Sequence, residues 1–523
     1  MVMVTSENRQ SPLPTGARPC DMTLIDPHIG YRALQSRDSR FDGRLFVGVT
    51  STGIYCRPIC PARTPKAENC RFFPSSAAAQ ENGFRPCLRC RPETAPELAF
   101  WRGTSNTVSR ALALIAEGGL DSSSGVDILA GRLGIGERQL RRLFKQHLGA
   151  SPVAVAQTRR VLFAKQLIHD TRMPMTEIAF AAGFGSVRRF NETFQTLFRR
   201  PPRALRRSAA SDVPAGDASQ SGVTLLLPYR PPFDWASMLG FLEARAIAGV
   251  ERVADDTYSR TVRHNGSCGL VTVRHAPTRQ SLAVTVRFPC VRALPHILAR
   301  VRRVFDTGAD IDVIGLHLSK DPFLARLVAQ RPGLRAPGAW DGFELAVRAI
   351  LGQQITVEAA RHLAGRLVQI AGPSLAGQPD SAPPLSLIFP SADEVVTADL
   401  APLGMPSARR AALTAMAQAA IEDPLLFHAA GTLEEAVDRL RRIRGIGDWT
   451  AQYIALRALR ETDAFPATDI GLLRGAADVS GRRPTPADLV TRSEQWRPWR
   501  AYAAQHLWAA DAALAGASKG RLT

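Results

Sequence analysis

Four of the eight cysteines stand in two close pairs, and this feature most restricts how the chain can fold. Cys56 and Cys60 are separated by three residues, Cys87 and Cys90 by two, and 26 residues lie between the pairs. Two such pairs can close a tetrahedral site around one zinc ion, and zinc binding then contributes to folding. The start, MVMVTSENRQ, lacks the layout of a secretory signal, which favours a metal site over disulfides. The spacing alone also fits a purely structural zinc ribbon.

The charge of the chain indicates a polyanionic partner. Its 523 residues carry 66 Lys and Arg against 47 Asp and Glu, a formal charge of +19. Residues 127–207 concentrate this excess, with sixteen Lys and Arg against five Asp and Glu. Nucleic acid is the commonest partner for such a surface. No apolar run reaches the roughly 18 residues that a membrane helix needs, so we expect a cytoplasmic protein without a membrane partner.

Length and texture predict a multidomain α+β protein. Strand-like alternation appears near residues 269–288, whereas an Ala/Leu/Arg-rich helical texture dominates after about 320. We expect the following segments: a disordered tail at 1–20, a four-cysteine zinc domain at 21–100, an all-α DNA-binding domain at 101–207, a flexible linker at 208–222, a small α/β subdomain at 223–315 and a helical domain at 316–515.

The basic segment contains two helix–glycine turn–helix patterns about 48 residues apart. In the second unit, Phe190, Phe194 and Phe198 recur every fourth residue and predict a buried stripe. The opposite face, with Arg188 and Arg189, can then lie in the major groove. A solvated charged face on an ordinary helical bundle is the alternative for any one such helix.

The cysteine-bearing stretch resembles the N-terminal domain of the Ada family, which responds to DNA alkylation in bacteria. The resemblance rests on TGIYCRPIC at 52–60, ENCRF at 68–72 and GFRPCLRC at 83–90. It implies that the two cysteine pairs hold one Zn²⁺ and that Cys56 also accepts a methyl group from a DNA methylphosphotriester. Methylation would remove negative charge near phosphates and strengthen DNA binding. We expect Cys70, a fifth cysteine, to be a small buried side chain.

The basic helical segment is similar to the DNA-binding region of AraC-type regulators, including GF-x-S-x-x-x-F and the closing Arg-Pro-Pro-x-x-x-Arg. In Ada the same region follows the zinc domain. The resemblance implies promoter DNA as a partner, with RNA polymerase as the expected protein partner. The DNA-contacting candidates are Arg138, Arg141, Arg142, Arg188 and Arg189.

The C-terminal half contains a Gly445-x-Gly447 turn between helical stretches, followed 22 residues later by Asp469. Paired glycines let a backbone approach a phosphate, and free N–H groups at the next helix can bind it. The combination looks like the helix-hairpin-helix DNA glycosylase superfamily. The match is closer to the 3-methyladenine DNA glycosylase II (AlkA) family, through markers that run in family order from Pro231 to Trp508.

That resemblance implies a small β-containing subdomain followed by helical subdomains, and a specific chemistry. Asp469 is the candidate that stabilises an oxocarbenium-like sugar while a flipped, alkylated base departs. The matching aromatic positions would form the pocket for a cationic base through cation–π attraction. These candidates are Phe241, Trp449, Tyr453 and Trp508. Core packing is the commoner explanation for any one of them.

Four observations refine the expected activity. No lysine lies between Lys320 and Lys519, so no Schiff-base nucleophile is expected near Asp469 and the enzyme should be monofunctional. Gln354 stands where the best-known family members place an apolar wedge, and Ile470 replaces an aromatic residue. The Pro-Cys-His-Arg motif of the second repair domain of Ada is absent from the sequence.

Together these features predict an alkylation-repair fusion: a methyl-accepting regulator that binds promoter DNA and activates transcription, joined to a glycosylase for bases such as 3-methyladenine. The strongest alternative is a regulator whose glycosylase half is inactive and only grips DNA. A small-molecule-sensing AraC regulator and a plain zinc-ribbon scaffold are further alternatives.

Overall fold

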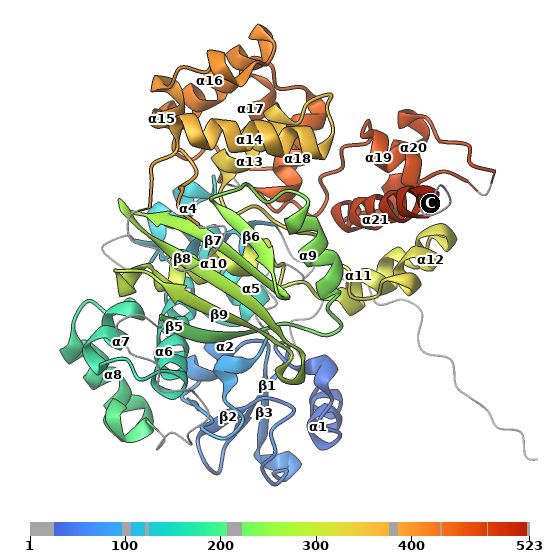
Figure 1. Cartoon of the computed structure of the whole chain (residues 1–523). Helices are drawn as coiled ribbons and strands as arrows, with labels where there is room; N and C mark the ends of the chain where they lie inside the picture. The colour runs from blue at the N-terminus through green and yellow to red at the C-terminus, as the bar shows by residue number, and fades with distance from the viewer. Residues whose placement is uncertain are drawn as a thin grey trace, which may run out of the picture.

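The computed structural model describes residues 26–96, 106–120, 125–206, 222–375, 385–428, 431–478 and 480–519. The predicted tail at 1–20 and nearly all of the predicted linker at 208–222 lie outside the described residues. Figure 1 shows a small sheet with flanking helices, a larger central sheet and an all-helical part around the C-terminus. Among the described residues, no helix is long and apolar enough to cross a membrane.

The cysteine-bearing part is a four-stranded sheet with the order β3-β1-β2-β4. Strand β2 pairs in parallel with β4, with Tyr55 opposite Pro86. The chain therefore leaves both strands at the same edge, directly at Cys56 and Cys87. The elements are α1 (Pro27–Gln35), β1 (Phe46–Val49), β2 (Ile54–Cys56), β3 (Cys70–Phe73), α2 (Ser76–Glu81) and β4 (Arg85–Pro86).

Two helix pairs follow, as the sequence predicts, and the structure adds a long helix that joins them. The side chains of Phe190, Phe194 and Phe198 are all buried, at 0%, 0% and 5% exposure. Ser186 caps the helix that carries them by accepting from the Arg189 backbone N–H. The helices are α3 (Asn106–Ala116), α4 (Val126–Arg132), α5 (Glu137–Leu148), α6 (Pro152–Asp170), α7 (Met175–Ala181) and α8 (Val187–Phe198).

The central sheet is antiparallel, with the order β5-β9-β8-β7-β6. Alternate residues of β9 are buried, as expected for a sheet that packs its core on one face. Its elements are β5 (Val223–Pro228), α9 (Trp235–Glu243), β6 (Glu251–Ala254), β7 (Thr257–His264), β8 (Ser267–Ala276), β9 (Ser281–Arg287) and α10 (Leu294–Val304).

The remaining described chain is helical. Asp, Ser or Thr side chains cap most of these helices, and capping boxes begin α15, α17 and α20. The helices are α11 (Ile311–Leu318), α12 (Pro322–Gln330), α13 (Gly342–Leu351), α14 (Val357–Ala371), α15 (Ala392–Thr397), α16 (Ser407–Glu422), α17 (Leu433–Arg441), α18 (Asp448–Arg457), α19 (Ile470–Gly475), α20 (Pro486–Ser493) and α21 (Arg500–Lys519).

The hydrophobic cores run across the predicted domain boundaries. One core joins the cysteine-bearing sheet to the first helix pair, for example Tyr55 with Phe144. A second joins the second helix pair to the central sheet, for example Phe190 with Val284. A third core fills the helical C-terminal part and extends to Ile247 and Val250, just before β6. The predicted boundaries at 100 and 222 divide the sequence into segments, but these segments do not each have a hydrophobic core of their own.

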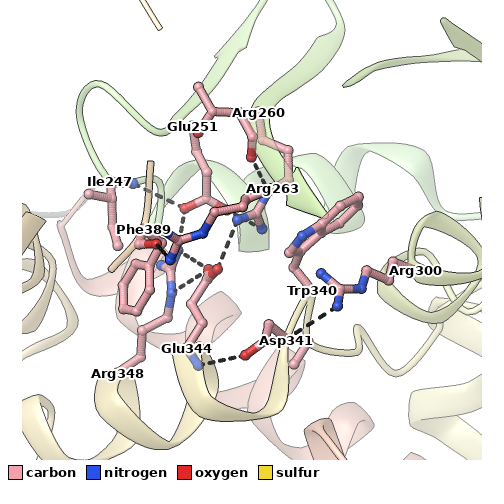
Figure 2. A network of polar contacts seen from close by, with 12 residues as sticks. Ile247, Glu251, Arg260, Arg263, Arg300, Trp340, Asp341, Glu344, Arg348 and Phe389 are labelled. Carbon is pink, nitrogen blue, oxygen red and sulfur yellow. Dashed lines mark hydrogen bonds and ion pairs between the residues drawn. The ribbon is translucent and has the colours of Figure 1, made fainter. Parts of the chain in front are cut away.

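A buried ion-pair network ties the central sheet to α13 (Figure 2). Arg260 on β7 contacts Glu344 on α13 at 2.8 Å, and Arg348 contacts both Glu344 at 2.7 Å and Glu251 at 2.5 Å. Burial alone would raise the pKa of Glu344, but the charges of Arg260 and Arg348 outweigh it and lower the pKa to about 2. The network fixes the sheet relative to the helices that carry the C-terminal site.

Candidate active sites

The four paired cysteines converge at one edge of the small sheet. Their Sγ atoms all lie within 4.8 Å of one another. Cys60, Cys87 and Cys90 are buried, whereas Cys56 keeps part of its surface exposed. A cluster of four thiol ligands at this separation fits a tetrahedral zinc site, and the one partly exposed member is the cysteine that the sequence predicts as the methyl acceptor.

The surroundings of the cluster also fit a bound cation with four thiolates. The backbone N–H of Arg57 donates to Cys90 Sγ at 3.4 Å, and that of Arg89 donates to Cys87 Sγ at 3.3 Å. Hydrogen bonding with Cys60 raises the pKa of the Cys56 thiol, whereas hydrogen bonding with Cys56 lowers that of Cys87. A Zn²⁺ ion held by the four sulfurs would supply the positive charge that lets four neighbouring thiolates coexist.

Cys70 departs from its expected burial. It is only half-buried, its Sγ donates to the Lys66 carbonyl at 3.4 Å, and it lies outside the four-cysteine cluster. The reason is its place at the start of the edge strand β3, where one neighbour in the sheet is missing. Its exclusion from the cluster agrees with the four-coordinate interpretation.

A buried lysine that the sequence analysis did not single out holds the zinc segment against α6. Lys165 is 0% exposed, and its Nζ donates to the Cys87 carbonyl at 2.9 Å and to Glu93 at 2.6 Å. The neighbouring Gln166 donates to the Leu226 carbonyl of β5 at 2.9 Å. The sequence offered one signal of a buried lysine, because Lys165 stands inside the largely apolar stretch VLFAKQLI.

The predicted DNA-contacting arginines lie on the exposed faces of α5 and α8. All five are exposed, opposite the buried stripes that contain Phe144 and Phe190. Arg141 pairs with Glu137 at 2.6 Å and Arg188 with Glu192 at 2.7 Å, each one helical turn away on the same face. Such surface pairs are weak, so phosphates can displace the carboxylates.

Asp469 is the N-cap of α19, and four N–H groups hold its carboxylate. Its Oδ1 accepts from the backbone N–H groups of Gly471 at 2.9 Å and Leu472 at 3.0 Å. The indole Nε1 of Trp508 donates to the same oxygen at 2.9 Å, and that of Trp449 donates to Oδ2 at 2.7 Å. A Cβ at Gly471 would lie 3.0 Å from Asp469 Oδ1, so glycine leaves room for this arrangement.

The four predicted pocket aromatics form one connected group beside this carboxylate, which only Trp449 and Trp508 contact directly. Trp449 and Tyr453 stack with ring centroids 5.3 Å apart and an angle of 9° between their planes, and Trp508 meets Tyr453 edge-on at 6.2 Å. Phe241 reaches the group from α9 in the other subdomain, through the guanidinium of Arg457. All four rings are half-buried rather than sealed in the core.

Arg457 is a member of this site that the sequence analysis missed. Its Cζ lies 4.8 Å from the ring centroid of Phe241 and 4.9 Å from that of Trp508. The side chain is buried, donates to Pro337 O and Gln505 Oε1, and burial lowers its pKa to about 10. Its spacing, four residues after Tyr453 and eight after Trp449, places it on the same helix face and was a usable signal.

The glycine turn lies between α17 and α18, as predicted. Gly445 has a φ of +85°, and a Cβ there would lie 2.4 Å from Ala412 Cβ, so the turn requires glycine. Gly447 is the N-cap of α18, which has no side-chain cap and therefore leaves backbone N–H groups free for an anion. Gln353 donates to the Gly445 carbonyl at 3.1 Å, and Gln354 is exposed at the next position with a φ of +59°.

Family models match three parts of the chain. The metal binding domain of Ada matches residues 30–93, a helix-turn-helix domain matches 129–208, and the AlkA N-terminal domain matches 224–341. These spans cover the cysteine cluster, the two helix pairs and the central sheet, in the order that the sequence analysis predicts.

Known proteins with similar sequences cover almost the whole chain. The probable bifunctional transcriptional activator/DNA repair enzyme AlkA of Mycobacterium tuberculosis (strain ATCC 25618 / H37Rv) is 42% identical over 479 residues, 91% of this chain and 95% of the relative. DNA-3-methyladenine glycosylase 2 of Escherichia coli (strain K12) is 37% identical over 54% of this chain and 95% of its own length. The solved 3-methyladenine DNA-glycosylase from Archaeoglobus fulgidus covers 55% of this chain and 97% of its own, with 19% identity and a TM-score of 0.49. The chain thus belongs to the family of the bifunctional AlkA proteins, in which an Ada-type regulator precedes an AlkA-type glycosylase.

Proposed function

We propose that this chain repairs alkylated DNA through two chemistries. Its C-terminal half is a monofunctional DNA glycosylase that hydrolyses the N-glycosidic bond of alkylated bases such as 3-methyladenine. Its N-terminal half accepts a methyl group from a DNA methylphosphotriester, binds promoter DNA and activates transcription. The observation that carries the glycosylase assignment is the carboxylate of Asp469, held by four N–H groups beside a cluster of half-buried aromatic rings.

Asp469 stabilises the sugar cation as the base departs. Ring alkylation makes the base a better leaving group, and positive charge then develops on the sugar. A carboxylate whose orientation is already fixed needs no rearrangement at that moment, which is the condition for strong electrostatic stabilisation. The two indoles and the start of α19 supply that fixation. Asp469 acts by its charge, by orienting the attacking water, or by both.

The aromatic residues receive the flipped base. The parallel faces of Trp449 and Tyr453 offer a stacking surface, and electron-rich rings attract a cationic base. The N–H groups at the start of α18 bind a backbone phosphate next to the lesion. Gln354, exposed at the turn before α14, fills the space that the base leaves in the stack. Each of these contacts uses an exposed or half-buried group of the site.

Cys56 accepts the methyl group at the other site. Zinc, when bound by the four cysteines, keeps them deprotonated at neutral pH. The Cys56 sulfur attacks the methyl carbon of the phosphotriester, an S–C bond forms, the C–O bond breaks, and the phosphodiester leaves with the bonding electron pair. Cys56 ends as a thioether, so the domain acts once. The lost negative charge increases affinity for DNA.

The double helix-turn-helix connects this reaction to transcription. Its exposed arginines on α5 and α8 contact promoter DNA in the major groove, and RNA polymerase is the protein partner of the activator. The chain acts on double-stranded DNA in the bacterial cytoplasm, associated with the nucleoid. The alternative, a regulator with an inactive glycosylase half, is disfavoured because Asp469 and the four aromatics are assembled rather than scattered.

Base release from methylated duplex DNA tests the glycosylase assignment. Asp469→Asn should lower the single-turnover rate of 3-methyladenine release by about a thousandfold, because it removes the charge that stabilises the sugar cation. Asp393→Asn on exposed α15 is the matched control and should behave as the wild type. An Asp469→Asn rate equal to that of the wild type would remove Asp469 from the mechanism. A wild-type chain that releases no base would favour the regulator alternative.

Mass spectrometry tests the methyl acceptor. After incubation with a duplex that carries one methylphosphotriester, one methyl group should be found on Cys56 and none on Cys60, Cys87 or Cys90. A methyl group on any other cysteine, or on none, would contradict the assignment. Zinc content, measured on the same preparation, checks that the cluster is loaded.

A further inference from the structure

Helix α3 belongs to the predicted DNA-binding segment, but it contacts both halves of the molecule. Val108, Ala111 and Ile115 are buried in the core shared with the cysteine-bearing sheet. Arg110 extends instead to the C-terminal half. Its side chain is 9% exposed, and that of its partner Glu461 is 3% exposed. The ion pair between them is therefore removed from solvent.

Arg110 bridges two segments that lie far apart in the sequence. Its Nη2 lies 2.5 Å and its Nε 3.1 Å from Glu461 Oε1, while its Nη1 donates to the Gly431 carbonyl. Gly431 immediately precedes Thr432, the N-cap of α17, which leads into the glycine turn. Glu461 lies in the connection from α18 to Asp469. One guanidinium thus joins the entrance of the hairpin to the approach of the candidate catalytic residue.

Glu461 depends on this arginine. Among the described residues, Arg110 is the only hydrogen-bond partner of its carboxylate; the nearby Arg460 pairs with Asp306 at 2.5 Å. The acidic groups that act on Glu461 are Glu434 and Asp463. Removing Arg110 would leave a buried carboxylate facing like charges, and an unpaired buried charge is strongly unfavourable. The connection would then have to shift or take up a proton.

The rest of this junction is loosely packed. A cavity of about 130 Å³ lies there, lined from both halves by residues that include Arg110, Arg159, Phe427 and Glu461. A second polar contact lies at the end of the same stretch, where Glu117 meets Arg303 at 3.4 Å. Arg303 in turn donates to the Ala339 carbonyl, and the Ala339 N–H donates to the Arg457 carbonyl. At this junction, polar bridges span the cavity between α3 and the C-terminal half, away from the hydrophobic core that joins the second helix pair to the central sheet.

We propose that Arg110 is a positioning residue of the glycosylase, supplied by the DNA-binding half. It holds the segment that leads to Asp469 and the segment that leads into the hairpin in one fixed relation, so that the carboxylate meets the sugar while the hairpin grips the strand. The inference rests on the proposed glycosylase function. If Arg110 has this role, the regulator half contributes directly to the geometry of the glycosylase site.

Base release by the full chain, followed over a range of methylated-DNA concentrations, tests this inference. Arg110→Met should lower kcat for 3-methyladenine release by about tenfold with little change in KM, because small misplacements of catalytic groups reduce the rate rather than binding. Arg110→Lys, which keeps the charge but not the fork, should recover part of the rate. Arg279→Met, at an exposed turn, is the control. Rates are expressed per correctly folded, zinc-loaded molecule.

Hydrogen exchange gives a second measurement. Amides of residues 458–468 should exchange faster in Arg110→Met than in the wild type, whereas amides of the central sheet should not. If Arg110→Met folds poorly, Glu461→Gln, which keeps the acceptor oxygen, should show the same two changes more weakly. Unchanged kcat, or a change in KM alone, would overturn the inference. A wild-type chain that releases no base would instead overturn the proposed function, so the two failures are distinguishable.

Discussion

The cysteine cluster and the Asp469 site reach their geometry in opposite ways. The four cysteines lie within 35 residues of one another, on two strand ends and two tight loops of one small sheet. The Asp469 site draws Phe241 from α9, Trp449 and Tyr453 from α18, and Trp508 from α21. The first site is encoded locally, whereas the second exists only once distant helices have packed.

The two sites also differ in the chemistry that we propose for them. In the proposed function, the sulfur of Cys56 is itself the nucleophile and is consumed, so the other three cysteines need only hold the cluster together. In the same proposal Asp469 serves repeatedly without changing, and two backbone N–H groups and two indoles hold its carboxylate in place. A single-use acceptor needs reactivity, whereas a turnover site needs a fixed charge.

The largest expected effect concerns the cysteine cluster. Cys56→Ala should abolish methyl uptake completely, because the attacking sulfur is gone, and should leave 3-methyladenine release within about twofold of the wild type, since interactions of distant sites are usually independent. Methyl uptake is followed with a labelled phosphotriester duplex. Cys70→Ala, outside the cluster, is the control and should retain uptake. Residual uptake by Cys56→Ala would contradict the acceptor assignment.

The next effect concerns how the zinc segment is held. Lys165→Met should destabilise the regulator half by about 3 kcal/mol, because the buried carboxylate of Glu93 keeps only its pair with Arg91 and the Cys87 carbonyl loses its donor. Denaturant unfolding followed by zinc release measures this loss. Lys145→Met, whose pair with Glu81 is exposed, should cost less than about 1 kcal/mol. Equal stability of the two variants would show that the Lys165 contact does not hold the zinc segment.

A third prediction concerns how the stability of the glycosylase half depends on pH. Burial, with a contribution from Arg331, lowers the pKa of His506 to about 4 from an ordinary value near 6.5. The folded state thus binds this proton less readily than the unfolded state. The contribution of neutral His506 to the free energy of unfolding is fully present above pH 6.5. It is lost as the pH drops from 6.5 toward 4, by about 3 kcal/mol in total.

Unfolding of the full chain at pH 4.5 and pH 7 checks this dependence. His506→Gln should lose that part of the pH dependence, whereas His28→Gln, at an exposed position of α1, should keep it. The same slope in the wild type and in His506→Gln would show that another group is responsible.

The smallest expected effect tests whether the indole N–H of Trp449 holds the carboxylate of Asp469. Trp449→Phe keeps an aromatic ring but removes the N–H that donates to Asp469 Oδ2, so base release should fall by about tenfold, close to the lower net worth of one hydrogen bond to a charged group. Trp499→Phe, buried elsewhere in the same half, is the control. Single-turnover rates measure both. A Trp449→Phe rate equal to that of the control would mean that the indole serves only for stacking.

Much of the fold could be predicted because its signals are local. The cysteine spacing predicts the cluster, the four-residue repeat of Phe190, Phe194 and Phe198 predicts the buried face of α8, and the paired glycines predict the turn before α18. Each depends on residues that are neighbours on one element. The structure confirms all three geometries.

The interactions between elements could not be predicted in the same way. Nothing in the sequence near Trp508 shows that its indole reaches Asp469, 39 residues away, or that Arg457 lies among the aromatic rings. The burial of Lys165 and the bridge from Arg110 to Glu461 depend on how whole segments pack. Cys70 was misjudged because its burial depends on β3 being an edge strand, which only the sheet order shows.

The most direct test of two independent chemistries in one chain is a single incubation with duplex DNA that carries both 3-methyladenine and a methylphosphotriester. Released base and methylated protein are measured together for the wild type, Cys56→Ala and Asp469→Asn. We predict that Cys56→Ala loses only protein methylation and that Asp469→Asn loses only base release. Loss of both products in either variant, or base release that survives Asp469→Asn unchanged, would contradict the account.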